Sequence, residues 1–326
     1  MLFRSIYESD DDMVIKSCDV ASLYPSSIIA NDAFPQHLGK EFTRVYDEKI
    51  VSVRLAEKVK PKAEQDAIIV AGYKLAANSV YGKSNSKYSF LYDSQLTMQV
   101  TINNQLMMTM LAERLVDTIP NSTMLMINTD GLEIRIPREY EYMYDEICAK
   151  WEKYTKFILE HEEYQKLVIR DVNNYLGVYI DGKIKRKGDF NYEFLKEKQY
   201  HKNFSQIIVA KAVEQFFINS ISVEETILNN TLMSDFFKRT KIPRTGSLIA
   251  VEGEEMVEKL QRITRYYVAQ SGITLIKVLP PLKDKTEHRY INIEAGNLCM
   301  ECNSLTTSLF DEMKYNLNYQ YYINEA

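Results

Sequence analysis

The stretch Asp19-Val20-Ala21-Ser22-Leu23-Tyr24-Pro25-Ser26 decides how the rest of the chain is interpreted. The residues before it, 13–18, mix apolar and small side chains and predict a buried or half-buried strand that ends at a carboxylate. Pro25 suits the first turn of a following helix. An aspartate at the end of a strand, followed by backbone amides that turn into a helix, is well placed for a metal ion and a phosphate chain. The same arrangement is also typical of a simple helix cap, so this stretch alone does not decide the function.

Two later stretches favour the functional interpretation. Lys74-Leu75-Ala76-Ala77-Asn78-Ser79-Val80-Tyr81-Gly82 carries a lysine, an Asn-Ser pair and a Tyr-Gly pair at fixed offsets, and residues 124–134 place Asp130 in a tight turn between apolar strands. With these stretches in this order, the chain resembles the polymerase module of family B DNA polymerases. That family's motifs run as Asp-x-x-Ser-Leu-Tyr-Pro-Ser, Lys-x-x-x-Asn-Ser-x-Tyr-Gly and a turn with Thr-Asp. The first two match here at every defining position.

The resemblance implies an α+β fold, a right-hand polymerase with an antiparallel-sheet palm, two-helix fingers and a mainly helical thumb. We expect the palm over residues 1–41 and 83–188, with a primer-contacting hairpin at its end, the fingers over 42–82 and the thumb over 189–326. Members of the family usually carry an N-terminal exonuclease, and we expect that domain to be absent from this chain, either separate or missing. The short connections between the motifs favour nucleic-acid priming, and the compact fingers suggest a phage or a virus.

Composition is that of a soluble globular protein, with 326 residues, 45% of them apolar and 26% charged. No apolar run approaches the roughly 18 residues that span a bilayer, and no signal peptide opens the chain, so we expect no membrane partner. The four cysteines show no disulfide framework, which suits a reducing cytosol. The expected location is the cytoplasm, that of the host cell for a phage protein.

The net charge of −5 argues mildly against a nucleic-acid partner, because phosphate contacts favour basic surfaces. Lysines and arginines nevertheless gather in two places, over 54–62 and over 183–187. Either cluster could be an ordinary solvated face. Their positions relative to the motifs favour contact with a nucleotide or with DNA.

The periodicity of the first half predicts mainly helices. Residues 42–60 have helical spacing, with Val51, Leu55 and Val59 on one face, and Pro61 ends that helix before a second run over 64–81. Further elements are expected along the chain: a helix over 95–115, two strands over 123–127 and 132–136, a helix over 139–160 with Trp151 buried, a hairpin over 175–187 that turns at Asp181-Gly182, and helices over 205–220, 223–238 and 254–270. A single Cys-x-x-Cys over 299–302 makes a zinc site improbable.

By the resemblance, Asp19 and Asp130 are the catalytic residues, and with the backbone carbonyl of Val20 they are the metal ligands. The ions would be two Mg²⁺, with Mn²⁺ as an alternative, because hard divalent cations prefer oxygen ligands and substrate phosphates. The family usually has Asp-Thr-Asp where this chain has Asn128-Thr129-Asp130. The retained aspartate is the one that the family uses as its firm ligand, so the resemblance implies activity with altered metal affinity.

The resemblance also implies a set of residues that hold the deoxynucleoside triphosphate (dNTP). Tyr24 would lie under the sugar and leave no space for a ribose 2′-hydroxyl. The whole expected set is Ser22, Leu23, Tyr24, Arg54, Lys58, Lys74, Asn78 and Tyr81. Of these, Lys58 rests only on its spacing to Arg54, and Tyr81 could instead be an ordinary core residue.

The hairpin after the third motif resembles the element that holds the primer strand. The implied DNA-binding residues are Tyr175, Lys185, Lys187 and Gly188. The lysine of the family's Lys-x-Tyr motif is replaced by Asn173, so one phosphate contact is in doubt. The alternative for this hairpin is a solvated β-ribbon.

The sequence therefore predicts template-directed DNA synthesis, a nucleotidyl transfer from a dNTP to a primer 3′-hydroxyl, with primer–template DNA as the partner. One alternative is another palm-type polymerase such as a reverse transcriptase, although the first two motifs are not of that family. The other is a non-catalytic DNA-binding remnant. Asn128 and the expected absence of an exonuclease favour it, and the retention of Asp19, Asp130 and Lys74 opposes it.

Overall fold

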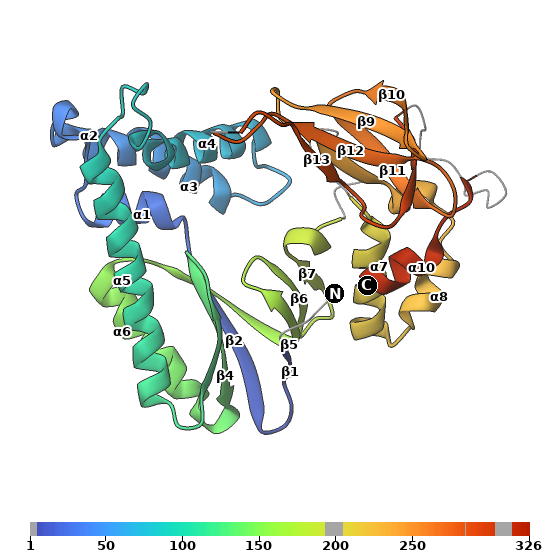
Figure 1. The fold of residues 1–326 in the computed structure, drawn as a ribbon. Helices are drawn as coiled ribbons and strands as arrows, with labels where there is room; N and C mark the ends of the chain where they lie inside the picture. Colours follow the sequence, from blue (N-terminus) through green and yellow to red (C-terminus); the bar gives the residue numbers. More distant parts are fainter. Residues whose placement is uncertain (1–4, 193–204, 284, 304–314) are drawn as a thin grey trace. The chain divides into compact units, whose positions relative to one another are not determined.

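The computed structural model describes residues 5–192, 205–283, 285–303 and 315–326. The chain divides into two compact units (Figure 1). The N-terminal unit comprises Ile6–Leu167 and Gly177–Lys185, and the C-terminal unit comprises Met1–Ser5, Val168–Leu176 and Arg186–Ala326. None of the helices in the described part of the chain combines the length and the apolar character that a membrane crossing requires. The finer division into palm, fingers and thumb stays a prediction.

Antiparallel pairing organises the first sheet, whose strand order is β3-β4-β2-β5-β6-β7, with β1 paired to β5. Its strands are β1 (Ser5–Glu8), β2 (Met13–Val20), β3 (Thr123–Ile127), β4 (Gly131–Pro137), β5 (Leu159–Asp171), β6 (Asn174–Tyr179) and β7 (Ile184–Arg186). The strand expected before the first motif is β2, and it lies between β4 and β5, antiparallel to both. The expected strands on either side of the Asp130 turn and the hairpin turn at Gly182, where φ is +81°, are also confirmed.

Helices α5 (Ser94–Thr118) and α6 (Glu141–Thr155) cover one face of this sheet (Figure 1). Alternate residues of β2 and β4 point into the core that these helices complete, among them Cys18, Val20 and Ile134. Trp151 of α6 is 5% exposed and donates from Nε1 to the Met107 carbonyl at 2.9 Å, so its expected burial is confirmed. The residues between these apolar positions lie on the opposite face of the sheet, and that face carries the first motif's aspartate.

The helix expected over 139–160 is too long. It ends at Thr155, and Leu159 already begins β5. Glu160, Glu162 and Glu163 are therefore strand residues that pair with β2.

Two helical runs joined near Pro61 are confirmed. The first consists of α2 (Glu41–Tyr46), the π-helical turn η2 (Asp47–Val51) and α3 (Ser52–Val59), and the second is α4 (Ala67–Ser84). The Asp66 side chain caps α4 by accepting from the backbone amides of Ile68 and Ile69.

The buried face of α3 differs from the expectation. Leu55 and Val59 are 44% and 86% exposed, whereas Arg54 and Glu57 are 8% and 7% exposed. Glu57 accepts from the Asp66 backbone amide at 2.7 Å and from Lys60 Nζ at 2.6 Å. Hydrogen bonds made by its charged residues, rather than an apolar stripe, define the inner side of this helix.

The C-terminal unit combines helices with two antiparallel sheets. Among its described residues the α-helices are α7 (Ile207–Asn219), α8 (Val223–Leu228) and α10 (Tyr319–Glu325). The sheets run in the orders β10-β9-β12-β13 and β14-β11-β8, built from β8 (Lys238–Lys241), β9 (Ser247–Glu252), β10 (Glu255–Leu260), β11 (Ile263–Ala269), β12 (Thr274–Leu279), β13 (Arg289–Asn292) and β14 (Leu298–Glu301). One core, which includes Phe236, Val268 and Tyr322, joins the helices to these sheets.

The expectation of a mainly helical C-terminal part is wrong. The helix expected over 205–220 is present as α7, but the one expected over 223–238 ends at Leu228, and residues 254–270 form β10 and β11 instead of a helix. The turn before β10 contains Gly253 at a φ of +62°, and β11 pairs with β8 and β14. Pairing overrides the local helical pattern here, with β9 across a tight turn in the case of β10 and with the more distant β8 and β14 in the case of β11.

Candidate active site

The two motif aspartates lie at the ends of neighbouring strands in the N-terminal unit. Asp19 of β2 is directly opposite Gly131 of β4, and the Val20 amide donates to the Asp130 carbonyl at 2.6 Å. A Cβ atom at Gly131 would come within 2.1 Å of Asp19 Oδ1. The Asp19 carboxylate therefore lies over the glycine that follows Asp130, so the two acidic residues are brought to one edge of the sheet.

Asn128 closes the turn that presents Asp130. Its side-chain Oδ1 accepts from the backbone amides of Asp130 at 3.2 Å and Gly131 at 3.0 Å. Its backbone amide donates to the Gly131 carbonyl at 2.9 Å. Asparagine is suited to such a turn because its side-chain oxygen bonds backbone amides two and three residues on. Asn128 therefore holds the turn through hydrogen bonds from its side chain to the backbone.

Sequence reasoning missed a third carboxylate near the pair. Glu133 is directly opposite Ser17, whose Oγ is 3.4 Å from Glu133 Oε1, and it is 3% exposed. Its Oε2 is buried without a hydrogen-bond partner among the described residues. Burial raises the pKa of Glu133 to about 7, which the Lys185 charge opposes and the Asp19 charge assists. The signal was present in the sequence, because the apolar alternation of residues 132, 134 and 136 places 133 on the face that carries Asp19.

The loop after Asp19 is held by a buried arginine. Ser22 has a left-handed φ of +54° and precedes α1 (Leu23–Ala30). Arg54 Nη1 donates to Ser22 Oγ at 2.8 Å. The first amides of a helix have no acceptor within the helix, so the start of α1 offers donors to an anion. Two of the predicted nucleotide-binding residues, Ser22 and Arg54, are thus in direct contact.

A stacked tyrosine pair connects α1 with α4. The rings of Tyr24 and Tyr81 have centroids 4.0 Å apart and an interplanar angle of 10°. Burial raises the pKa of Tyr24, and the neighbouring Tyr81 and the charge of Asp130 raise it further. The Tyr81 hydroxyl is also 2.9 Å from Thr101 Oγ1 on α5.

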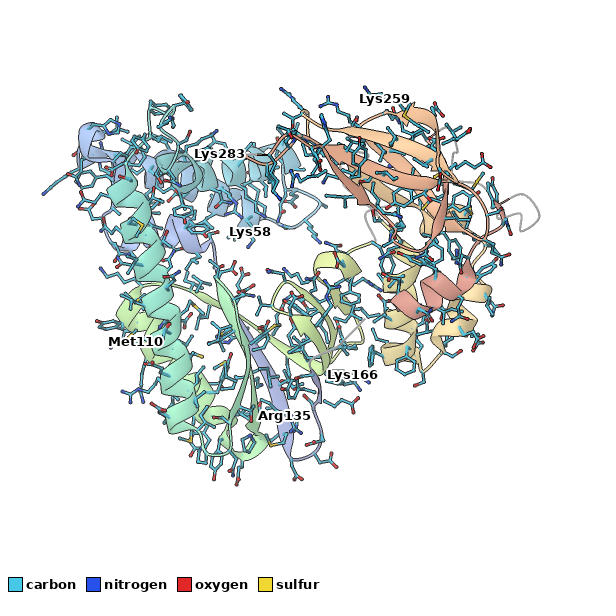
Figure 2. The ribbon with its side chains drawn as sticks, in the orientation of Figure 1. Lys58, Met110, Arg135, Lys166, Lys259 and Lys283 are labelled. Carbon is cyan, nitrogen blue, oxygen red and sulfur yellow. The ribbon has the colours of Figure 1, made fainter. Side chains whose placement is uncertain are left out.

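Lys74, Asn78 and Tyr81 share one face of α4, because they are spaced at i, i+4 and i+7. Lys74 and Asn78 are exposed, and Lys74 forms no ion pair within the described ranges. Since Tyr81 stacks on Tyr24, this face is turned toward the start of α1. Lys58, which Figure 2 labels on α3, is instead 3.2 Å from Glu160 Oε1 with both side chains more than half exposed.

The donor set at this edge fits a hard divalent cation in part. Asp19, Asp130 and the Val20 carbonyl supply only oxygen atoms, and Mg²⁺ commonly takes one or two carboxylates and completes its shell with water and substrate phosphates. Among the described residues, no three acidic, histidine or cysteine side chains converge as a complete metal site. These three groups would leave the rest of a Mg²⁺ shell to water and other oxygen ligands.

The four hairpin residues expected to bind DNA differ in their exposure and in their contacts. Lys185 Nζ donates to Glu162 Oε2 and to the Tyr164 hydroxyl, both at 2.7 Å. Tyr175 is 2% exposed. Gly188 has a φ of +64°, and a Cβ there would be 2.1 Å from Asn174 Oδ1. Lys187 is exposed and forms no ion pair in the described part of the chain.

No protein-family model matches the sequence, and no curated protein sequence matches it either. Among solved structures, the chain is similar to the family B DNA polymerase from the hyperthermophilic archaeon Pyrobaculum calidifontis, with 14% sequence identity and a TM-score of 0.49. The similarity covers 98% of this chain and 44% of that polymerase. The chain thus spans less than half the length of the archaeal protein.

Proposed function

We propose that the chain carries out template-directed DNA synthesis by nucleotidyl transfer from a dNTP to a primer 3′-hydroxyl. The observation that carries the proposal is the register of β2 and β4, which sets Asp19 opposite Gly131 and so next to Asp130. The order of the three sequence motifs supports the same reaction. Its partners would be primer–template DNA and dNTPs, with the family's exonuclease domain either separate or missing.

Asp19, Asp130 and the Val20 carbonyl would hold two Mg²⁺ or Mn²⁺ ions. Such ions lower the pKa of the attacking hydroxyl and neutralise the charge that develops on the leaving pyrophosphate. The role of the protein is then to present two carboxylates at one place. The strand register does this for Asp19, and the Asn128 turn does it for Asp130.

The dNTP would lie between the start of α1 and the exposed face of α4. Lys74 would neutralise the triphosphate as a point charge, and the amides of Ser22, Leu23 and Tyr24 would bind phosphate oxygens. Arg54 would act on the triphosphate through Ser22, because its guanidinium is buried against that hydroxyl. Tyr24, fixed by its stack on Tyr81, would exclude a ribose 2′-hydroxyl. Asn78 would line the nascent base pair.

A primer-extension assay with Mg²⁺ tests the proposal. We expect Asp19→Asn and Asp130→Asn each to abolish extension, because each removes a charged metal ligand. Asp11→Asn, an exposed aspartate in the β1–β2 connection, is the matched control and should extend like the parent chain. Extension by the Asp130→Asn chain at a rate comparable to that of the control would overturn the assignment.

The same assay separates the alternatives. Extension on an RNA template as well as on a DNA template would indicate a reverse transcriptase. Binding of primer–template DNA without any extension by the parent chain would indicate a non-catalytic remnant. Asn128 is the observation that favours the remnant, but its side chain already makes the hydrogen bonds that hold the turn.

A further inference from the structure

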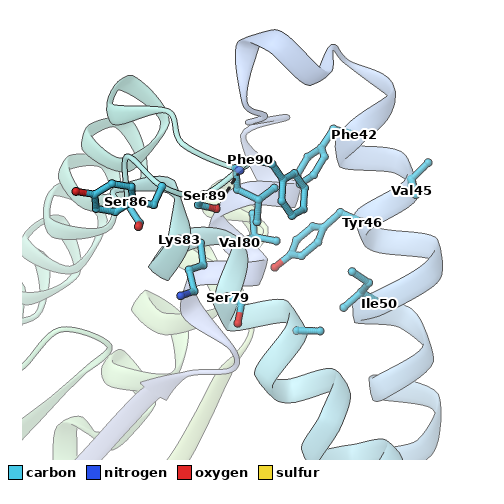
Figure 3. A pocket seen from close by; sticks show the side chains of 13 residues that line it. Phe42, Val45, Tyr46, Ile50, Ser79, Val80, Lys83, Ser86, Ser89 and Phe90 are labelled. Atoms are coloured by element: carbon cyan, nitrogen blue, oxygen red, sulfur yellow. Dashed lines mark hydrogen bonds between the residues drawn. The ribbon is translucent and has the colours of Figure 1, made fainter.

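A cavity of about 520 Å³ lies within the N-terminal unit, on the α2 side of α4 (Figure 3). In Figure 3, Phe42, Tyr46 and Ile50 come from α2 and η2, and Val80 and Lys83 come from α4. The segment after α4 closes a further side with Ser86, Ser89 and Phe90. This volume is within the range of small-molecule sites, roughly 300–1,000 Å³.

The lining is mainly aromatic and aliphatic, and most of its polar groups are already satisfied. The Tyr46 hydroxyl donates to the Ala77 carbonyl at 2.9 Å, Ser79 Oγ donates to the Leu75 carbonyl at 2.7 Å, and Ser89 Oγ accepts from the Leu91 amide at 3.1 Å. These hydroxyls therefore have little left to offer a polar ligand. The body of any occupant has to be apolar.

Lys83 is the exception, because it is the charged residue of the lining. It is exposed and forms no ion pair within the described part of the chain. A second cation stands close by in sequence, with Lys87 Nζ 5.2 Å from the centre of the Tyr88 ring at the rim. An apolar cavity with an unpaired ammonium is complementary to an anion that carries a hydrophobic body.

The cavity is separate from the proposed nucleotide-binding face. At about 100° per residue, Ala76, Val80 and Lys83 lie on one side of α4. Lys74 and Asn78 fall on the opposite side of the same helix. A ligand in the cavity would contact α4 without competing for the exposed lysine of the other face.

We propose that this cavity binds an amphipathic organic anion, whose flat or aliphatic apolar body lies between α2 and α4 and whose acidic group binds Lys83. The site is independent of nucleotide, metal and DNA. A flat aromatic body would pack against Phe42, Tyr46 and Phe90, and a carboxylate or sulfonate would reach the ammonium at the mouth.

Two matched dyes test the proposal on the full chain. Anilinonaphthalene sulfonate carries an acidic group, and phenylnaphthylamine has the same aromatic body without it. Fluorescence titration should give saturable binding of both. Ala76→Phe places a ring inside the cavity and should weaken both dyes by at least about tenfold, because the ring occupies space that the dye body needs. Ala71→Phe, at an exposed position of α4 outside the lining, should leave both affinities unchanged.

Lys83→Gln is the second variant of the test, and it removes the charge without filling the cavity. It should weaken the sulfonate by about fivefold, the size of a partly exposed charge contact, and leave the neutral dye within twofold. Unchanged affinities in Ala76→Phe would place the dyes elsewhere and overturn the proposal. Equal effects of Lys83→Gln on the two dyes, or none on either, would overturn the role of Lys83. Thermal melting of each variant shows that it is folded, and a failed Ala76→Phe fold leaves the Lys83 arm decisive.

Discussion

Two groups of cations that look alike in the sequence differ sharply in their surroundings. In the group over 54–62, Arg54 donates to a neutral serine, and Lys58 and Lys60 pair with Glu160 and Glu57. Lys74, on the neighbouring α4, forms no ion pair in the described ranges. On the hairpin, Lys183 pairs with Asp181, and Lys185 with Glu162. The hairpin's Arg186 binds Glu214 through two hydrogen bonds of 2.6 and 2.7 Å.

The difference shows that a run of lysines and arginines is not by itself a phosphate-binding surface. On the hairpin, most of the positive charges form ion pairs with carboxylates. Lys187 is exposed and forms no ion pair among the described residues. On α4 the charge of Lys74 remains available. Three substitutions can break or sharpen this contrast.

The largest effect is expected at Arg186. Glu214 is 3% exposed, so Arg186→Met would leave a buried carboxylate without its cation and should lower the free energy of unfolding by about 3–5 kcal/mol. The neighbouring Lys187→Met is the matched control and should change it by less than about 0.5 kcal/mol. Urea denaturation measures both. Equal stabilities of the two variants would show that the Arg186–Glu214 pair contributes nothing.

Lys74→Ala should give the next largest effect, on catalysis rather than stability. Loss of one charge-assisted contact of about 2–3 kcal/mol corresponds to a decrease of roughly 30- to 150-fold in kcat/KM for the dNTP. Lys62→Ala, an exposed lysine in the α3–α4 connection, should leave kcat/KM unchanged. Steady-state incorporation kinetics decide the matter, and a decrease shared by both variants would point to general electrostatics instead of a specific contact.

Glu133→Gln should give a smaller effect that depends on pH. The pKa of Glu133 is about 7 in the folded chain, against 4.5 for an exposed glutamate. Between these values the unfolded chain loses its proton first, so the parent chain is destabilised progressively as the pH rises from about 4.5 to 7. Above pH 7 this pKa shift lowers the free energy of unfolding of the parent chain by about 3 kcal/mol. Glu133→Gln removes that loss but still buries a polar group, so we expect it to raise the free energy of unfolding by about 2 kcal/mol at pH 8.

The gain in stability should be absent at pH 4, because the glutamate of the parent chain is then protonated and as neutral as the glutamine of the variant. Urea denaturation at the two pH values provides the comparison. A gain of the same size at pH 4 and pH 8 would contradict the burial of an ionising group at this position. The Lys185 charge nearby predicts a further decrease in stability when that lysine is neutralised.

Short-range signals in the sequence predicted the elements around the site. The strand before Asp19, the break at Pro61, the turn at Gly131 and the burial of Trp151 all depend on residues within one element or one turn. The register of β2 and β4 could not be read from the sequence. The motif resemblance nevertheless led to the expectation that Asp19 and Asp130 hold the same metal ions, which requires them to lie close together.

Long-range pairing explains the errors. Residues 254–270 have a helical pattern, but in β11 Tyr266 pairs with Glu301 and Arg265 with Arg239, and such partners cannot be read locally. The β10 part of this range was missed for a different reason, because its partner β9 lies just across the turn at Gly253. The alternation of residues 132, 134 and 136 already placed Glu133 on the face of Asp19, but its burial beside Ser17 depends on the strand register. The neutralisation of the hairpin lysines depends on Glu162 and Glu214, which come from distant elements.

The π-helical turn η2 sets the orientation of the helix that follows it. Buried positions in this run are Thr43, Tyr46, Val51, Arg54 and Glu57. They are three residues apart, except across η2, where the step is five. Without the wider turn, α3 would be rotated by about 100° and Arg54 would leave Ser22. A related chain that lacks one residue within 47–50 would present a different residue of α3 to Ser22, in place of Arg54. Comparison of such a chain with this one requires a gap inside the helical run.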